Sequence, residues 1–392
     1  MLKEQLWERF MDRYGESEHP ARVFNAPGRV NLIGEHLDYN GGYVLPAALE
    51  FGTTLIIRRR DDDQISFTST NMDDTRTISI NGEALNRTDQ WTDYPIGVIS
   101  ELNKLGYRLS CGYDLLYQGD IPNGAGLSSS ASLEVVTAFA LLSMEGKETD
   151  TVEIAKLSQK AENLFIGVNS GIMDQFAVAN GKADHAILLM CDTLEYELVP
   201  FQTGAYQIVI ANTNKRRGLV DSKYNERRSE CDRALEILQQ EIPALTYLAQ
   251  LNPEQFASLQ DTIQDETVRR RAKHVVEENQ RVLDSVKSLR AGDLEAFGQY
   301  MTQSHNSLRY LYEVTGDELD ALVEEAQRIP GTLGSRMTGA GFGGCTVSLV
   351  HQDSVERFIA EVGENYEART GLKSDFYVCG VGHGVHEVKG GK

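Results

Sequence analysis

Strand-like and helix-like segments of this 392-residue chain fall into separate blocks rather than strict alternation. The segments 53–60, 64–70 and 75–80 are short, rich in β-formers and divided by acidic turns, so they predict strands that pair antiparallel. Helical spacing of apolar residues follows at 90–106 and 123–146. Strands grouped beside helices indicate an α+β fold with mixed or antiparallel sheets.

The length of the chain predicts two domains. A strand at 206–214 is expected to open the second one, which places the boundary between 1–204 and 205–392. Helices dominate from there on. The segment 268–289 carries a near-heptad apolar stripe that indicates core packing rather than a coiled coil. A helix at 353–370 and a last strand at 374–381 complete the expected order.

Charge and cysteine content restrict the class of partner. The formal net charge is −20, which argues against nucleic acid or an anionic membrane as partner. No apolar run approaches the roughly 18 residues of a membrane span. The five cysteines show no metal-binding spacing, so reduced thiols and a cytoplasmic location are expected.

The segment GRVNLIGEHLDYNGG, from Gly28 to Gly42, concentrates polar side chains between glycines. It holds Glu35, His36 and Asp38 together, and neither a surface loop nor a core strand accounts for that cluster. Converging donors and acceptors on a bent backbone suit a small polyol, because every buried sugar hydroxyl needs a partner. The segment therefore predicts a sugar-binding turn.

A second polar segment, the serine loop PNGAGLSSSAS from Pro122 to Ser132, leads into a helix. Its glycines allow close approach of a ligand, and the following helix N-terminus offers free N–H groups to an anion. No lysine follows, so this is not the GxxxxGK[ST] phosphate loop. Taken alone, the segment is also compatible with a serine-capped helix after a turn.

Three further features each allow two interpretations. Asp174 lies among apolar residues and needs either a cationic partner or a chemical role. Glu162 sits one residue off the apolar stripe Ile154, Leu157, Ala161 and Leu164, which favours a surface carboxylate. The glycine-rich segment 334–344 fits a ligand-wrapping loop or a tight hairpin.

Four segments, in this order, resemble the galactokinases of the GHMP small-molecule kinase superfamily. GRVNLIGEHLDYNGG is similar to the signature GRVNxIGEHxDYNGG, and PNGAGLSSSAS to the phosphate loop PxGxGLSSSA. AENLFIGVNSGIMDQ (161–175) resembles AExxFxGxxxGIMDQ, and GSRMTGAGFGG (334–344) the third glycine motif. The resemblance implies a two-domain GHMP kinase fold with the active site in the cleft between the domains. It also implies transfer of the γ-phosphoryl group of ATP to the anomeric hydroxyl of α-D-galactose, giving galactose 1-phosphate and ADP, the first phosphorylation of galactose catabolism.

The resemblance further implies a role for individual residues. Asp174 matches the base at the anomeric hydroxyl, and Arg29 the arginine beside that base and the transferring phosphoryl group. The positions matching sugar-binding residues are Glu35, His36, Leu37, Asp38 and Tyr224. The positions matching nucleotide-binding residues are Ser69, Trp91, Gly124, Ala125, Gly126, Leu127, Ser128, Ser129 and Ser130. Ser130 and Glu162 match the magnesium ligands, so Mg²⁺ is the expected cofactor, with ATP and galactose as substrates and the chain a monomer.

Two positions depart from the pattern. Leu37 replaces a threonine of the sugar signature, and Ala340 replaces a glycine of the third motif. The first leaves sugar selectivity open, so an N-acetylgalactosamine or arabinose kinase is the nearest alternative. A catalytically silent galactose sensor, known among fungal relatives, is another, although those lack part of the serine loop. A purely structural protein would leave the Glu-His-x-Asp cluster unexplained.

Overall fold

The computed structural model describes residues 2–82, 85–121, 126–215 and 220–389. Gly124 and Ala125, two of the predicted nucleotide-binding residues, lie outside the described residues. The strands are β1 (Arg22–Asn31), β2 (Tyr43–Val44), β3 (Pro46–Arg59), β4 (Gln64–Ser69), β5 (Arg76–Ser79), β6 (Tyr113–Gly119), β7 (His185–Met190), β8 (Tyr196–Pro200), β9 (Tyr206–Asn212), β10 (Thr332–Thr338), β11 (Cys345–His351), β12 (Asp375–Cys379) and β13 (His386–Glu387). The α-helices are α1 (Leu2–Tyr14), α2 (Asp93–Lys104), α3 (Ser129–Met144), α4 (Thr151–Ala161), α5 (Met173–Asn180), α6 (Val220–Leu238), α7 (Pro253–Leu259), α8 (Glu266–Arg290), α9 (Leu294–Ser307), α10 (Asp317–Arg328) and α11 (Val355–Thr370).

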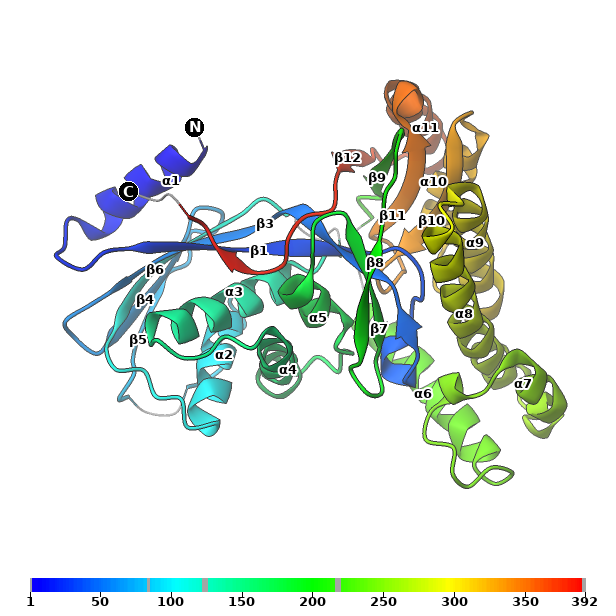
Figure 1. The fold of residues 1–392 in the computed structure, drawn as a ribbon, viewed down its shortest axis with the longest axis horizontal. Helices are drawn as coiled ribbons and strands as arrows, with labels where there is room; N and C mark the ends of the chain where they lie inside the picture. The colour runs from blue at the N-terminus through cyan, green and yellow to red at the C-terminus, as the bar shows by residue number, and fades with distance from the viewer. Residues whose placement is uncertain (1, 83–84, 122–125, 216–219, 390–392) are drawn as a thin grey trace.

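A six-stranded mixed sheet in the order β13-β1-β3-β6-β4-β5 forms the long half of the molecule (Figure 1). The pair β4 and β5 is antiparallel, as predicted. The predicted pairing of β3 with β4 is wrong, because β6 lies between them and runs parallel to β4. Proximity along the chain suggested a hairpin, but the segment after α2 inserts as the central strand.

Helices cover both faces of this sheet to different extents. Helices α2, α3, α4 and α5 lie together on one face, while α1 crosses the other face near its end (Figure 1). Side chains alternate along β3: Leu55 joins the core under α3, and Ile56 packs against Phe10 of α1. Helix α1 thereby covers part of the outer face of the sheet with Leu6 and Phe10.

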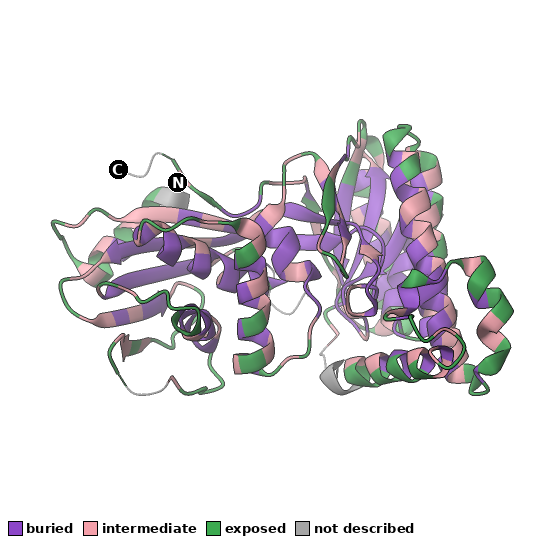
Figure 2. Ribbon diagram, turned by 60° about the horizontal axis from the view of Figure 1, so that its bottom comes forward, coloured by how far each residue is buried: buried purple, intermediate pink, exposed green. Residues whose placement is uncertain are grey.

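The other half contains a four-stranded antiparallel sheet in the order β10-β11-β9-β12. The predicted near-heptad stripe of α8 is buried against its neighbours, as expected of core packing. Figure 2 shows that the strands of both sheets are largely buried while the outer helix faces remain exposed. A three-stranded sheet, β2-β7-β8, lies beside α8 at the junction.

The C-terminal segment ends in the long half of the molecule, at the six-stranded sheet. The predicted last strand, 374–381, corresponds to β12, but β13 follows it and pairs with β1. The expectation that 374–381 is the last strand is therefore wrong. The α+β class with mixed and antiparallel sheets is confirmed, and the boundary at residue 204 stays a prediction.

Candidate active site

A cavity of about 200 Å³ opens at the junction of the two halves. Its walls come from β1 and the β1–β2 connection, from the segment 162–174, from α6 and from the β10–β11 loop. Its lining residues are Arg29, Glu35, His36, Asp38, Glu162, Val168, Ser170, Gly171, Met173, Asp174, Tyr224, Gly339 and Ala340. Three of the four sequence motifs thus supply side chains to one small polar cavity.

The centre of the cavity is a two-point ion pair between Arg29 and Asp174. Arg29 Nε and Nη2 donate to Asp174 Oδ1 and Oδ2, each at 2.8 Å. The third guanidinium nitrogen, Nη1, donates to the carbonyl of Gly126 at 2.8 Å, and Ser128 Oγ donates to Asp174 Oδ2 at 2.5 Å. The serine loop is therefore bonded to both members of the pair, and the predicted sugar-binding turn shares the same cavity.

Arg29 is almost fully buried, whereas Asp174 keeps 32% of its side chain exposed toward the cavity. Burial opposes the charged form of the guanidinium, but the charge and hydrogen bonds of Asp174 raise the pKa of Arg29 above its usual value. The arginine therefore stays cationic, and the carboxylate has one side available to a ligand. Of the two alternatives for Asp174, the cationic partner is present as Arg29, and the chemical role stays a prediction.

Hydrogen bonds fix the shape of the predicted sugar-binding turn (28–42), named the sugar turn. His36 has a φ of 63°, and its Nδ1 lies 2.8 Å from the hydroxyl of Tyr39, which in turn lies 2.8 Å from the hydroxyl of Tyr312. Glu35 Oε1 accepts a hydrogen bond from the backbone N–H of Gly339 at 2.7 Å. A backbone contact with the third glycine motif thus orients one sugar-turn carboxylate.

Burial changes the protonation of two residues in this turn. Desolvation lowers the pKa of His36 to about 3, so the ring is neutral near pH 7. Desolvation and the nearby charge of Asp174 raise the pKa of Asp38 to about 7. Gly171 is required here, because a Cβ at this position would lie 1.9 Å from Asp38 Oδ2.

A second cavity, also about 200 Å³, lies on the other side of the serine loop. Its lining residues are Thr53, Ser69, Asn71, Met72, Trp91, Tyr94, Tyr117, Gly119, Ile121, Ser129, Ser130 and Leu133. The indole N–H of Trp91 donates to the carbonyl of Asp74 at 2.9 Å, and its ring meets Tyr117 edge to face. An aromatic wall opposite hydroxyl donors suits a nucleoside with attached phosphates.

Glu162 joins the two cavities. It lines the first one, and its Oε1 accepts from the hydroxyl of Ser130, which lines the second, at 2.9 Å. Glu162 is buried, so the expectation of a surface carboxylate is wrong, and Leu164 of the expected apolar stripe is 69% exposed. The reason is that α4 passes into a π-helical segment (Glu162–Ile166), whose wider turn rotates the side chains relative to an α-helix.

Burial and the charge of Asp174 raise the pKa of Glu162 above its usual value. A cation near this carboxylate would relieve that penalty. The described residues contain no cluster of three or more His, Cys, Asp or Glu side chains able to hold a metal. One hydroxyl and one carboxylate nevertheless suit Mg²⁺, which prefers oxygen ligands and keeps most of its waters.

Several predicted residues contribute differently from the rest. Leu37 is not among the described lining residues; its side chain is fully buried and its carbonyl accepts from the N–H groups of Asn40 and Gly42. Leu127 is also buried, and its carbonyl accepts from the N–H of Arg29. Sequence reasoning missed Ser170, which donates to Glu162 Oε2 at 3.0 Å. Sequence reasoning included Gln175 only within a motif and gave it no role. A polar residue next to Asp174 in an otherwise apolar segment could have indicated a buried hydrogen-bonding role.

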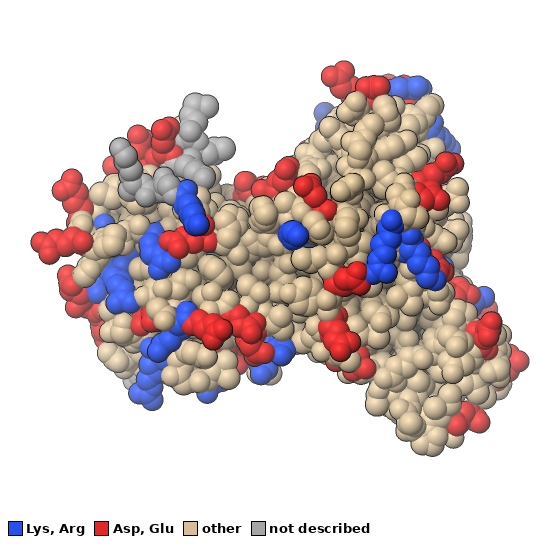
Figure 3. All heavy atoms as spheres, viewed as in Figure 1, with Lys and Arg blue, Asp and Glu red and all other residues tan. Residues whose placement is uncertain are grey.

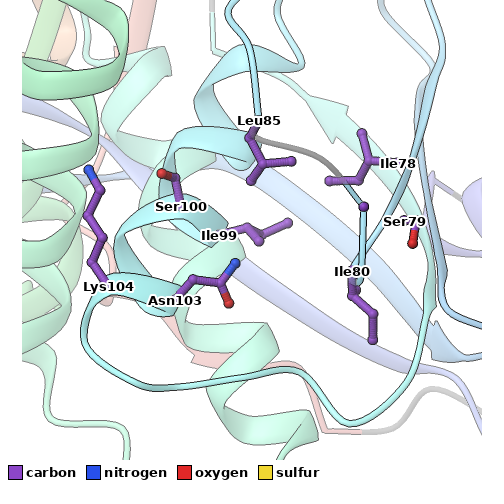
Figure 4. A pocket seen from close by; sticks show the side chains of 9 residues that line it. Ile78, Ser79, Ile80, Leu85, Ile99, Ser100, Asn103 and Lys104 are labelled. Carbon is purple, nitrogen blue, oxygen red and sulfur yellow. The ribbon is translucent and has the colours of Figure 1, made fainter.

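A larger cavity of about 430 Å³ lies elsewhere, between the end of β5 and α2 (Figure 4). Four of its nine described lining residues are aliphatic, namely Ile78, Ile80, Leu85 and Ile99, and Lys104 is the one titratable residue among the nine. The grouping of charged and hydroxyl side chains therefore marks the two 200 Å³ cavities, rather than this larger one, as the candidate site.

The surface and the helices bear on the class of partner. On the face shown in Figure 3, acidic and basic side chains are interspersed. The net charge of the whole chain is −20. Among the described residues, every helix is too short or too polar to cross a bilayer.

Comparison with known protein families defines the class first. The model for the GHMP kinase N-terminal domain matches residues 93–182, and that for the C-terminal domain matches 285–368. A mevalonate kinase crystal structure, 19% identical, superposes with a TM-score of 0.68 over 92% of this chain and 98% of that one, which shows a shared fold. The two domain matches identify the class as the GHMP kinases.

The particular family follows from closer matches. The galactokinase galactose-binding signature matches residues 8–59. The galactokinases of Fusobacterium nucleatum and Halalkalibacterium halodurans are each 50% identical over 99% of this chain and 100% and 98% of their own length. The crystal structure of Lactococcus lactis galactokinase complexed with galactose is 43% identical, with a TM-score of 0.96 over 99% of this chain and all of that one. The chain belongs to the galactokinase family.

Proposed function

We propose that this chain transfers the γ-phosphoryl group of ATP to the anomeric hydroxyl of α-D-galactose. The observation that carries the proposal is the Arg29–Asp174 pair, which borders the sugar turn on one side and is bonded to Gly126 and Ser128 of the serine loop on the other. Sugar in the first cavity and nucleotide in the second would meet at this pair.

Asp174 accepts the proton of the anomeric hydroxyl as that oxygen bonds to the γ-phosphorus. The bond between the γ-phosphorus and the β,γ-bridging oxygen breaks, and ADP leaves. Arg29 compensates the negative charge of Asp174 and orients both of its oxygens, and its burial keeps water from competing for those contacts. Phosphoryl transfer depends mainly on alignment and charge neutralisation, which this pair supplies.

Ser130 and Glu162 would hold Mg²⁺, since their oxygens lie between the two cavities and fit a hard cation. When bound, the ion would neutralise charge on the β- and γ-phosphates. This offsets the strongly acidic character of the chain near an anionic substrate.

Selectivity for galactose would come from paired hydroxyls. Glu35, His36, Asp38 and Tyr224 all line the sugar cavity. A site that pairs an axial 4-hydroxyl leaves its own polar groups unpaired when glucose binds, a penalty that reaches about 10⁴–10⁵-fold at most. Strong preference for galactose over glucose is the expected result.

The test is ADP release from ATP with a panel of sugars, with and without Mg²⁺. Galactose should give rapid turnover, and Asp174→Asn should lower kcat by about 10²–10⁴-fold while calorimetry shows galactose still bound. No ADP release with galactose would indicate a sensor rather than an enzyme. Near wild-type turnover by Asp174→Asn would refute the assignment of the base.

The chain is further proposed to act as a monomer in the cytoplasm. The five cysteines all lie in described segments and carry free thiols, which supports a reducing compartment. Sedimentation of the purified protein would test the monomer, and fractionation of its native cells would test the location.

A further inference from the structure

Gln175 lies between two buried carboxylates. Its Nε2 donates to Glu162 Oε2 at 2.7 Å and to Glu134 Oε2 at 3.2 Å. Gln175 and Glu134 are both fully buried, in α5 and α3. The described linings of the two cavities contain Glu162 but neither Gln175 nor Glu134, so these two side chains stand behind the site rather than in it.

The two hydrogen bonds set the orientation of the amide. Both use the nitrogen, and a carboxylate oxygen can only accept. Turning the amide over would bring its carbonyl oxygen against both carboxyl groups. Glu134 therefore holds Gln175 in one orientation, and Gln175 holds Glu162 Oε2, which leaves Oε1 of Glu162 directed at Ser130.

The arrangement is an unfavourable one for a purely structural core. Gln175 Oε1 and Glu134 Oε1 are buried without a hydrogen-bond partner among the described residues. Apolar residues of similar size would fill the same space without unpaired polar atoms.

We propose that Gln175, itself oriented by Glu134, is a positioning residue that holds the carboxylate of Glu162 in the geometry for binding Mg²⁺. The inference rests on the proposed function, in which Glu162 is a metal ligand. Hydrogen-bonding partners behind a metal ligand commonly contribute 10–100-fold to metal affinity or activity.

The experiment measures metal binding directly, with Mn²⁺ as the probe. Mn²⁺ is titrated into the full-length protein saturated with ADP, and free Mn²⁺ is read by electron paramagnetic resonance. Gln175→Leu should weaken Mn²⁺ binding about 10–100-fold, while calorimetry gives a galactose Kd within about twofold of wild type. The apparent activation constant for Mg²⁺ should rise with it, and KM for galactose should not.

Variants of Glu134 separate orientation from charge. Glu134→Gln still offers a carbonyl oxygen to Gln175 and should bind Mn²⁺ within about threefold of wild type. Glu134→Leu removes the acceptor and should weaken binding about tenfold or more. Gln239→Leu is the matched control, because Gln239 is a half-buried glutamine in the turn after α6 that donates to the carbonyl of Leu245, and this variant should leave Mn²⁺ binding unchanged.

Glu162→Gln distinguishes failure of this inference from failure of the proposed function. If Glu162→Gln leaves Mn²⁺ affinity unchanged, the metal assignment itself is wrong, and the inference falls with it. If Glu162→Gln weakens binding and Gln175→Leu does not, the positioning role is refuted. Should Gln175→Leu not fold, Gln175→Asn, with a shorter side chain, and the two Glu134 variants give the same decision: wild-type affinity in all of them overturns the inference.

Discussion

Replacing Arg29 by lysine tests the central pair, because it keeps the positive charge and removes the two-point contact. Arg29 makes three side-chain hydrogen bonds of 2.8 Å, two to Asp174 and one to Gly126. A lysine at this position can reach Asp174 with one nitrogen only. One bond to the carboxylate and the bond to the serine loop are therefore lost.

The structure gives the magnitude of the effect. A hydrogen bond to a charged group contributes about 1.5–3 kcal/mol, so two amount to roughly 3–6 kcal/mol. One factor of ten in rate corresponds to about 1.36 kcal/mol. Water can replace part of the contact, because Asp174 is 32% exposed. The lower end, a loss of about 10²-fold in kcat, is therefore the expected result for Arg29→Lys.

The assay is ADP release at saturating ATP and galactose, with galactose affinity from calorimetry. Arg58→Lys is the matched control, since Arg58 is equally buried, donates to Asp114 at 2.9 Å and to two carbonyls, and lies away from the cavities. The control should lower thermal stability and leave kcat unchanged. Retention of more than about a tenth of wild-type kcat by Arg29→Lys would refute the argument that two-point geometry, rather than charge, is what catalysis needs.

Three further outcomes follow from the site. Because the pKa of Asp38 is raised to about 7, its carboxylate form is lost as the pH falls through that value. Calorimetry should therefore show galactose affinity falling about tenfold per pH unit below about pH 6, with a flatter profile for Asp38→Asn; an equal slope in that variant would assign the titration to another group. Gly171→Ala places a methyl group against Asp38 Oδ2 and should weaken galactose binding about tenfold or more, roughly 1.4 kcal/mol, without changing ADP affinity; unchanged galactose affinity contradicts the close packing. Trp91→Ala should raise KM for ATP by about 5–150-fold, in line with roughly 1–3 kcal/mol of base stacking, and leave KM for galactose unchanged; an unaltered KM for ATP would show that Trp91 does not contact the nucleotide.

The local sequence was sufficient for the elements and for the chemical character of the motifs. The helical spacing of apolar residues predicted α2, α3 and α8. In α8 one face of the helix is buried, which requires that spacing. The clustered Glu35, His36 and Asp38 predicted a polar turn, because such side chains so close together suit ligand binding rather than core packing. These are properties of neighbouring residues, which the order of the chain contains directly.

Contacts between distant segments were decided by the tertiary structure alone. Insertion of β6 between β3 and β4, and the return of β13 to β1, depend on which strand edges remain unpaired after the chain has collapsed. The inward position of Glu162 depends on a π-helical segment that the apolar stripe did not predict. The amide bridge from Glu134 through Gln175 to Glu162 joins residues 41 and 13 positions apart. Each residue brings its own side-chain chemistry, but packing determines the partner of each buried polar group. Only packing excludes water, so that a buried polar group has to form its hydrogen bond with one particular neighbour.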